Sequence, residues 1–239
     1  MIPFRNFLRG ILFIIQSVKS FQIMVTELSK QFSLVNSWIN ELRNVDIQHD
    51  RMRFRRNMER IGEVAAFEIS KGLAQKEVEI QTPLDKIKVQ EIAVQPVITT
   101  ILRAGVPLFE GILNYFDRAD CGFVAAYRKH DANDYFSIKQ DYLTCPSIEG
   151  RPLVVADPML ATGASLIEAI KDLLTHGKPT QLHIVAAIAS RQGIETISKA
   201  YPDAEIWAGV IDPDLTSKGY ITPGLGDAGD LSYGEKLQR

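Results

Sequence analysis

Short apolar runs alternate with helical patterns from about residue 94 to residue 211. The runs lack the strict polar alternation of half-exposed strands, which favours strands buried on both faces. Strands are predicted at 94–102, 121–127, 151–157, 182–189 and 205–211, and helices at 107–116, 166–177 and 193–201. This order predicts an α/β fold with a mostly parallel sheet flanked by helices, as in a Rossmann-like core. Ligands of such sheets bind at the carboxyl ends of the strands, so candidate chemistry is sought there.

One long amphipathic helix is predicted at residues 50–71, as part of a helical lead-in before the alternating region. Its apolar positions recur at helical spacing and are Phe54, Met58, Ile61, Val64, Ala65 and Ile69. Its arginines fall largely on the other side and are Arg51, Arg53, Arg55, Arg56 and Arg60. Glutamates on the same helix favour a solvated face of charge pairs, and a phosphate-binding surface is the alternative.

The segment 128–150 is longer than most loops inside a compact domain. Within it Tyr135, Phe136, Ile138 and Tyr142 alternate with polar residues, a pattern typical of strands. We therefore expect a projecting β-hairpin arm here. Such an arm is able to cover a site or to pair with another subunit.

The composition is that of an ordinary globular protein, since 46% of the 239 residues are hydrophobic and 23% are charged. Lys and Arg number 27 against 29 Asp and Glu, which gives a formal net charge of -2. This balance argues against proteins that coat nucleic acid or bind anionic membranes, so neither partner is expected. Cys121 and Cys145 show no CxxC spacing and no neighbouring histidine pair, which favours reduced thiols in a cytoplasmic protein.

The first 24 residues carry Arg5 and Arg9 ahead of an apolar stretch, and so superficially resemble a signal peptide or anchor. The uncharged window between Arg9 and Lys19 is much shorter than the roughly 18 residues that span a bilayer. No convincing small-x-small cleavage site follows. We expect residues 1–24 to be a non-essential or disordered extension, and residues 25–239 to form a single domain. A short docking helix and a true targeting segment are the alternatives for the extension.

The stretch 153–170 carries the strongest chemical signal in the chain. A buried strand ends at Asp157, a turn of small residues follows, and a helical pattern begins at Leu166. Backbone N–H groups of residues 161–165 then converge at the positive end of the helix dipole, where anions bind. The stretch has neither a Walker loop nor a GxGxxG fingerprint, so we expect a phosphate site of another kind.

Residue types in this turn add to the phosphate-site interpretation. Thr162 and Ser165 supply hydroxyl donors, and Gly163 permits backbone angles and a close approach that a side chain would block. Asp157 suits a ligand with hydroxyls near its phosphate, because a carboxylate accepts hydrogen bonds from a ribose diol. The alternative is an ordinary helix N-cap by Thr162 or Ser165, which needs no ligand.

Four segments together resemble uracil phosphoribosyltransferases, which have the type I phosphoribosyltransferase fold. DPMLATGAS (157–165) is similar to their loop for phosphoribosyl pyrophosphate (PRPP), and YITPGLGDAGD (220–230) is similar to their uracil-binding segment. ILRAG (101–105) and the pair Tyr127-Arg128 match the same family in the same order. The resemblance extends over roughly residues 36–239, and its two long motifs make it specific.

The resemblance implies roles for individual residues. The PRPP contacts that it implies are Arg103, Arg128, Asp157, Pro158, Met159, Leu160, Ala161, Thr162, Gly163, Ala164, Ser165 and Asp227. The implied uracil contacts are Ile221, Gly226, Asp227 and Ala228, and the implied catalytic residues are Arg103, Arg128, Asp157 and Asp227. Physical reasoning agrees for the two arginines, because each follows a predicted strand and guanidinium suits pyrophosphate oxygens. A surface ion pair is the alternative for each arginine.

The implied reaction joins uracil to PRPP and gives UMP and pyrophosphate, a step of pyrimidine salvage. A ring nitrogen attacks the anomeric carbon as pyrophosphate leaves, and no side-chain nucleophile is required. Mg2+ is the expected cofactor, carried by PRPP and not by protein ligands. Catalysis is then mostly positioning and electrostatics, with the hairpin arm as a cover that excludes water. Main-chain groups around Gly224, Gly226 and Gly229 are expected to distinguish the uracil imide from cytosine.

Some positions depart from the family pattern. The turn reads TGAS where TGGS is usual, so Ala164 is expected to adopt backbone angles that a glycine would relax. Leu231-Ser232-Tyr233 stands where a basic residue commonly follows, and residues 189–195 also differ from the usual form. These departures keep one alternative open, a non-catalytic protein of the same fold that binds UMP or PRPP as a regulator.

Partners and effectors are implied by the resemblance alone. It implies a homo-oligomer, a dimer or a tetramer. GTP activates some relatives and is the candidate effector here, although the sequence shows no separate nucleotide motif. A phosphoribosyltransferase for another base, and a membrane-associated protein that uses residues 1–24, are the remaining alternatives.

Overall fold

The computed structural model describes residues 24–130 and 136–236, with their side chains except those of residues 126–141. Strands of its main sheet run in the order β1-β10-β9-β7-β4-β5-β6, and β8 pairs with β9 beside this path. Their bounds are β1 Val25–Glu27, β4 Val97–Leu102, β5 Asp120–His130, β6 Phe136–Thr144, β7 Pro152–Ala156, β8 Met159–Leu160, β9 Gln181–Ser190 and β10 Glu205–Asp212. Every pair is parallel except β5 with β6. The predicted mostly parallel sheet is therefore confirmed.

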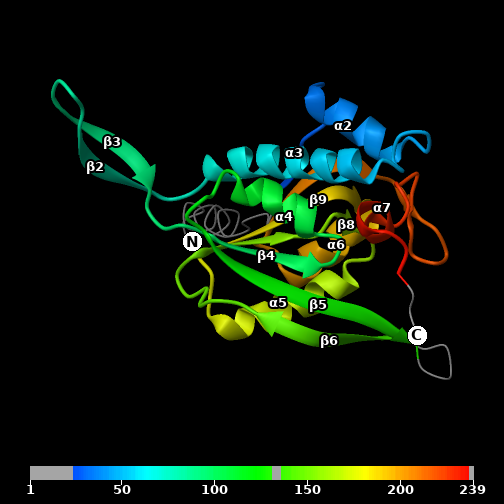
Figure 1. Ribbon diagram of the computed structural model, residues 1–239. Helices are drawn as coiled ribbons and strands as arrows, with labels where there is room; N and C mark the ends of the chain where they lie inside the picture. The colour runs from blue at the N-terminus through cyan, green and yellow to red at the C-terminus, as the bar shows by residue number, and fades with distance from the viewer. Residues whose placement is uncertain (1–23, 131–135, 237–239) are drawn as a thin grey trace, which may run out of the picture.

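Helices cover both faces of this sheet (Figure 1). Their bounds are α2 Leu34–Arg43, α3 Arg51–Ser70, α4 Val106–Leu113, α5 Ala164–Leu173, α6 Arg191–Ala200 and α7 Ala228–Tyr233, with a 3-10 turn at Leu174–His176. The α2, α3 and α4 helices pack on one face, and α5 and α6 pack on the other. Val154 and Ala156 of β7 point into the first core, whereas Leu153 and Val155 point into the second. The strands are buried on both faces, as their apolar runs predict.

Each strand and helix predicted between residues 94 and 211 is present, with ends that differ by a few residues. The amphipathic helix predicted at 50–71 is α3. Its N-cap Asp50 accepts a hydrogen bond from the backbone of Arg53, which satisfies one free amide of the first turn. The arginine face carries ion pairs, among them Arg53 with Glu41 at 2.6 Å, so the solvated interpretation of this face is confirmed.

Two strand regions were not predicted from the sequence. The helical lead-in is preceded by β1, which pairs with β10 at the edge of the main sheet. A strand of three residues, Val25–Glu27, is too short to show a periodic pattern. In addition, β2 (Gln75–Gln81) and β3 (Lys86–Ile92) form a separate antiparallel hairpin that projects away from the sheet (Figure 1). Most of its residues are exposed, so no buried face marks it in the sequence.

The hairpin arm predicted at 128–150 is confirmed as the antiparallel pair of β5 and β6. The pairing starts further back than predicted, at Phe123 with Thr144, and continues to His130 with Phe136. The arm is therefore an extension of the edge of the main sheet. Its tip at 131–135 lies outside the described residues.

Three further expectations meet the structure only in part. Residues 1–23 lie outside the described residues, and the division of the chain at residue 24 stays a prediction. Within the described ranges, no helix is long and apolar enough to cross a membrane. Cys121 and Cys145 are both free thiols.

Candidate functional site

The carboxyl ends of β4, β7, β9 and β10 bring several loops to one edge of the sheet. A cavity of about 940 Å3 opens at this edge. Its walls come from the segments 101–104, 157–166, 219–221, 226–230 and 235–236. This is the edge where ligands of parallel α/β sheets bind, and the volume suits a ligand of nucleotide size.

One wall is the turn between β7 and α5. Gly163 is the N-cap of α5 and has φ +83°, a left-handed conformation that favours glycine. A glycine has no side chain to cap the helix, and Thr162 Oγ1 accepts from the Ala164 amide only at 3.4 Å. The α5 helix therefore begins with backbone N–H groups that no side chain caps well, at the positive end of its dipole. The N-cap alternative for Thr162 or Ser165 is not supported, because neither residue occupies the cap position.

Ala164 is the first residue of α5 and has a helical backbone conformation. The expectation that Ala164 adopts angles better suited to glycine is therefore wrong. The unusual backbone angle falls on Gly163, one position earlier, where a glycine is present. A side chain at position 164 is compatible with this turn.

The same turn is held from behind by the start of α6. Ser190 at the end of β9 donates a hydrogen bond from its hydroxyl to the Ala161 carbonyl, at 2.6 Å, and accepts one from the Gly193 amide, at 2.8 Å. A Cβ on Gly193 would overlap the Ala161 carbonyl oxygen. The close approach of α6 to residues 160–161 thus requires a glycine at position 193, in the region that departs from the usual family form.

Asp157 lies directly after β7 and lines the cavity. It is partly buried, and its Oδ1 accepts from the Met159 amide at 3.4 Å. Burial raises the pKa of the Asp157 carboxyl to about 6, and this hydrogen bond only partly opposes the effect. The carboxylate is thus ionised at neutral pH and faces space in which it can accept hydrogen bonds from hydroxyl groups.

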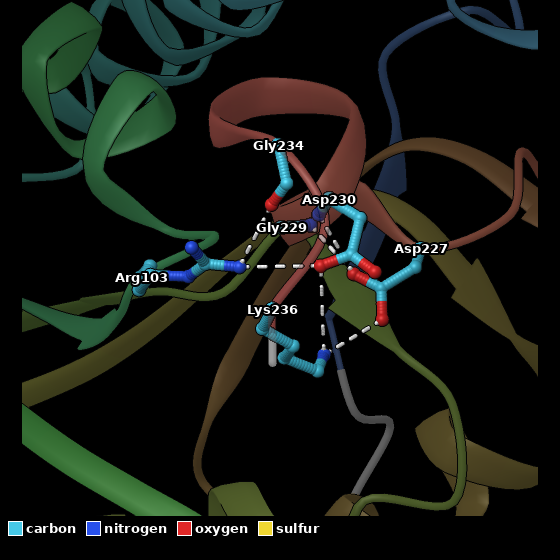
Figure 2. A network of polar contacts seen from close by, with 6 residues as sticks. All are labelled: Arg103, Asp227, Gly229, Asp230, Gly234 and Lys236. Carbon is cyan, nitrogen blue, oxygen red and sulfur yellow. Dashed lines mark hydrogen bonds and ion pairs between the residues drawn. The ribbon is translucent and has the colours of Figure 1, made fainter. Parts of the chain in front are cut away.

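Arg103 and Lys236 line the cavity beside the carboxylates of Asp227 and Asp230 (Figure 2). Arg103 Nη2 lies 3.2 Å from Asp230 Oδ1 and 3.2 Å from the Gly234 carbonyl oxygen. Lys236 Nζ lies 2.9 Å from Asp227 Oδ2 and 3.9 Å from Asp230 Oδ1. Arg103 therefore lines the cavity and makes an ion pair, as the alternative interpretation expects, while its contact with pyrophosphate stays a prediction. Its side chain is 45% exposed, which leaves it free to exchange partners.

Asp227 shapes the same wall as the N-cap of α7. Its Oδ1 accepts from the amides of Gly229 at 2.9 Å and Asp230 at 3.0 Å. Burial works to raise the pKa of the Asp227 carboxyl, but the hydrogen bonds from Lys236 and the two amides outweigh it and lower the pKa. Asp227 is therefore anionic across the neutral range. Asp157 is ionised at neutral pH but takes up a proton as the pH falls toward its pKa of about 6.

The glycine-rich segment after β12 (Ile221–Thr222) supplies the rest of this wall. Ile221 and Ala228 are buried, and Gly226 has φ +96°. Gly219 approaches the other wall, because a Cβ on it would lie 3.6 Å from the Thr162 methyl group. The two motifs singled out in the sequence, which lie more than fifty residues apart, thus face one cavity.

The structure brings most of the predicted site residues together. Those that line the cavity are Arg103, Asp157, Met159, Leu160, Ala161, Thr162, Gly163, Ser165, Ile221, Gly226, Asp227 and Ala228. Pro158 and Ala164 do not line it; Pro158 is buried, and Ala164 is exposed at the start of α5. Arg128 lies in β5, where its backbone pairs with Ile138, and its side chain is outside the described part of the chain.

Other lining residues were not predicted as site residues, and they include Gly219, Tyr220, Asp230, Glu235 and Lys236. Tyr220 and Asp230 belong to the quoted motif, so their position in the chain was a signal. Lys236 follows the last helix and belongs to no periodic element, so no pattern marks it. Lys236 nevertheless places a cation beside Asp230, and Leu231, which follows Asp230 in the chain, packs against the core.

Comparisons with known proteins fit this geometry. A family model described as uracil phosphoribosyltransferase matches residues 29–234. A uracil phosphoribosyltransferase of Porphyromonas gingivalis is 48% identical over 214 residues, which cover 89% of this chain and 99% of that protein. A uracil phosphoribosyltransferase of Thermococcus gammatolerans is 38% identical over 205 residues, 84% of this chain and 89% of that protein. The solved structure of the AQ2163 protein from Aquifex aeolicus has a TM-score of 0.79 at 30% identity, covering 90% of this chain and 100% of that one.

Proposed function

Since the chain belongs to the uracil phosphoribosyltransferase family, we propose that its cavity transfers the phosphoribosyl group of PRPP to uracil. The products are UMP and pyrophosphate, and the place of the reaction is pyrimidine salvage. The observation that carries the proposal is one cavity with an anion-binding helix end on one wall and a glycine-rich base segment on the other. The enzyme is specific for uracil, as the names of its relatives indicate.

The turn 157–165 binds the ribose 5-phosphate in this proposal. The first amides of α5 and the hydroxyls of Thr162 and Ser165 donate to phosphate oxygens. Asp157 accepts from the ribose hydroxyls, which requires its ionised form. The support is the glycine N-cap of α5, which leaves these amides to a ligand.

Arg103 binds the pyrophosphate group and stabilises the charge that develops on it as it leaves. To do so it exchanges Asp230 and the Gly234 carbonyl for pyrophosphate oxygens. Arg128 takes the same role by family resemblance. Its backbone lies in β5, next to β4, which carries Arg103 at its carboxyl end.

Uracil lies against residues 221 and 226–228, where main-chain amides and carbonyls meet the edge of the ring. Fixed backbone donors and acceptors match the uracil imide, and a base with a different donor pattern leaves them unpaired. Ile221 and Ala228 supply apolar contact, and Asp227 is shared with PRPP. A ring nitrogen of uracil attacks the anomeric carbon of PRPP on the face opposite the departing pyrophosphate.

Mg2+ enters bound to PRPP, in our proposal. Carboxylate oxygens are ligands that Mg2+ accepts, and among the described residues Asp157 and Glu235 are the cavity-lining carboxylates that make no ion pair. Asp227 and Asp230 already face Lys236 and Arg103. Bound Mg2+ would neutralise charge on the pyrophosphate leaving group.

Finer properties follow from the family resemblance. We propose a cytoplasmic homo-oligomer, a dimer or a tetramer, with residues 25–239 as its phosphoribosyltransferase domain and GTP as the candidate effector. Sedimentation of the full chain checks the oligomeric state, and initial rates with and without GTP check the effector. The β5–β6 arm is proposed as the cover that excludes water from the cavity.

The experiment that tests the function is a base panel. Purified full-length protein is given PRPP and Mg2+ with uracil, cytosine, hypoxanthine or orotate, and nucleotide and pyrophosphate are measured. The proposal predicts turnover with uracil and not with the other bases. Turnover with another base would change the substrate. No turnover with any base, with and without GTP, together with saturable UMP or PRPP binding, would favour the non-catalytic regulator instead.

A further inference from the structure

The base segment 223–227 has no regular secondary structure of its own. It links β12 to α7, and its backbone polar groups need partners outside helices and strands. Gly224 has φ +59°, and a Cβ there would overlap the Ile221 carbonyl oxygen. A segment of this kind holds one conformation only if neighbouring groups bind its backbone.

Three side chains from distant parts of the chain supply those partners. Asp212 Oδ2 accepts from the Gly224 amide at 2.9 Å, and Arg43 Nη1 donates to the Gly224 carbonyl at 3.4 Å. Gln48 Nε2 donates to the Leu225 carbonyl at 3.2 Å. We call Arg43, Gln48 and Asp212 the loop clamp.

The clamp is mostly buried, and two of its three side chains pair with each other. Arg43 Nη2 lies 2.7 Å from Asp212 Oδ1, with side chains 20% and 5% exposed. Gln48 is 8% exposed, and its amide nitrogen also donates to the Leu42 carbonyl at 3.0 Å. The last turn of α2 and the end of β10 are thereby joined to the same short loop. Removing either Arg43 or Asp212 would leave the other charge buried without its partner, so the contacts of these two side chains with Gly224 depend on each other.

The clamp lies behind the loop. None of its residues belongs to the cavity lining formed by the described residues, whereas Gly226, Asp227 and Ala228 directly after the clamped positions do. A role in direct contact with a substrate is therefore not the explanation for these hydrogen bonds. Leu225, between the clamped Gly224 and the cavity, is buried in the core on the α2 side of the sheet.

From this geometry we propose that Arg43, Gln48 and Asp212 are positioning residues for the base, and that they set the preference for uracil by fixing the backbone of residues 224–228. The inference rests on the proposed function, because it assumes that this segment binds uracil. Backbone readout depends on where amides and carbonyls stand, and misplacement by about 1 Å is enough to cost roughly a hundredfold in rate. Binding of PRPP is expected to depend less on the clamp, because its proposed contacts lie mainly in the turn 157–165 and at Arg103, and Asp227 is the one contact shared with the clamped segment.

Two variants and a matched control test the proposal. Arg43→Met removes the cation of the clamp, and Gln48→Met removes a neutral donor at similar volume and leaves no buried charge unpaired. Arg53→Met is the control, since Arg53 also anchors α2, through Glu41, but does not touch the base segment. All three are made in the full chain, with KM for uracil and for PRPP and the unfolding midpoint as readouts.

Each clamp variant is expected to raise KM for uracil by roughly 5–10-fold, the effect of about one lost hydrogen bond, with KM for PRPP changed less than about twofold. Amide exchange of a peptide spanning residues 223–228 is expected to accelerate in the clamp variants and not in the control. Arg43→Lys, which keeps the charge beside Asp212, is expected to rescue KM for uracil in part.

Equal changes in both KM values, or unchanged KM for uracil with only a lower unfolding midpoint, would overturn the proposal and leave the clamp a structural feature. If Arg43→Met does not fold, Gln48→Met and Arg43→Lys still decide the point. Failure of the proposed function has a different signature, because the wild-type protein itself would then form no UMP from uracil.

Discussion

Asp157 combines a cost in stability with a role in binding. Burial raises its pKa to about 6, so the folded protein holds an ionised carboxylate at neutral pH at the expense of stability. The proposed ribose contact explains why an acidic residue is kept in this position. Arg103 is the counterpart, a cation at the cavity wall that pairs with Asp230 and that, in the proposed function, exchanges this partner for pyrophosphate.

Asp157→Asn is expected to stabilise the protein at pH 7 while it lowers kcat/KM for PRPP about 10–100-fold, the effect of one charged hydrogen bond. The stability gain is on the order of 1–3 kcal/mol, from a pKa raised from 3.8 to about 6. Its sign follows from proton binding, because the folded state holds more protons than the unfolded state between the two pKa values. Wild-type stability therefore falls as pH rises through this window.

Urea unfolding of both proteins at pH 4 and pH 7 measures this effect. The gap between variant and wild type is expected at pH 7 and should close as pH falls toward 4. A variant less stable than wild type at pH 7 would contradict the burial argument. Activity adds a second check, since the wild type should lose kcat/KM below about pH 6 more steeply than Asp157→Asn, while PRPP titrates equally for both.

Single site residues could be predicted from the sequence where they belong to a motif. Residues whose partners come from distant parts of the chain could not. Asp157 and Arg103 follow buried strands and stand beside small residues, so their placement could be inferred. Lys236 and Asp212 could not, because their partners come from elements that only the folded sheet brings near. No local pattern encodes a contact between residues as far apart as Arg43 and Gly224.

Among the elements, the turn before α5 depends on the helix behind it. Gly193→Ala is expected to push residues 160–161 toward the cavity, since the new Cβ overlaps the Ala161 carbonyl. KM for PRPP should rise by about tenfold or more, as expected when binding groups are misplaced. Initial rates at varied PRPP measure this.

Gly72→Ala is the matched control for that variant, because a Cβ at Gly72 meets only the Ile69 carbonyl oxygen, at an ordinary contact distance of 3.7 Å. It should leave both KM values unchanged. If Gly193→Ala behaved in the same way, the packing of α6 would have no role in shaping the PRPP turn.

The departure at Ala164 is expected to be harmless. Ala164 is helical, so Ala164→Gly relieves no strain and costs up to about 1 kcal/mol of helix stability. The melting temperature should fall slightly, and kcat/KM for PRPP should stay within about twofold of the wild type. A several-fold gain in kcat/KM on this substitution would show that alanine does limit the turn.

Strands and helices were predicted correctly where a strand is buried on both faces or a helix buries apolar residues at helical spacing. The strands β4, β7, β9 and β10 are apolar on both faces, so their runs were visible. The hairpin of β2 and β3 was missed because it is mostly exposed. Its residues include cross-strand ion pairs, such as Lys88 with Glu77, so its sequence is largely polar and shows no buried face. For β1, only pairing with β10 defines the strand.

In the whole molecule, the sheet order explains how residues from 101 to 236 line one cavity. Parallel strands place their carboxyl ends at one edge, where β4, β7 and β10 are followed by the loops that line the cavity and β9 leads directly into α6. The fold class and the two walls of the site could thus be predicted from periodicity and motifs. The polar networks that orient those walls are set by tertiary contacts and required the structure.

The most direct test of the central claim is the initial rate of UMP and pyrophosphate formation from uracil, PRPP and Mg2+. It compares the wild type with Arg103→Ala and with Arg56→Ala. The Arg56 side chain is similarly exposed, at 46% against 45% for Arg103, and does not line the cavity. We predict equal amounts of UMP and pyrophosphate from the wild type. Loss of the pyrophosphate contact should lower kcat/KM for PRPP roughly a hundredfold in Arg103→Ala, with Arg56→Ala within about twofold of the wild type. A wild type that forms no UMP, or an Arg103→Ala variant as active as Arg56→Ala, would contradict the account.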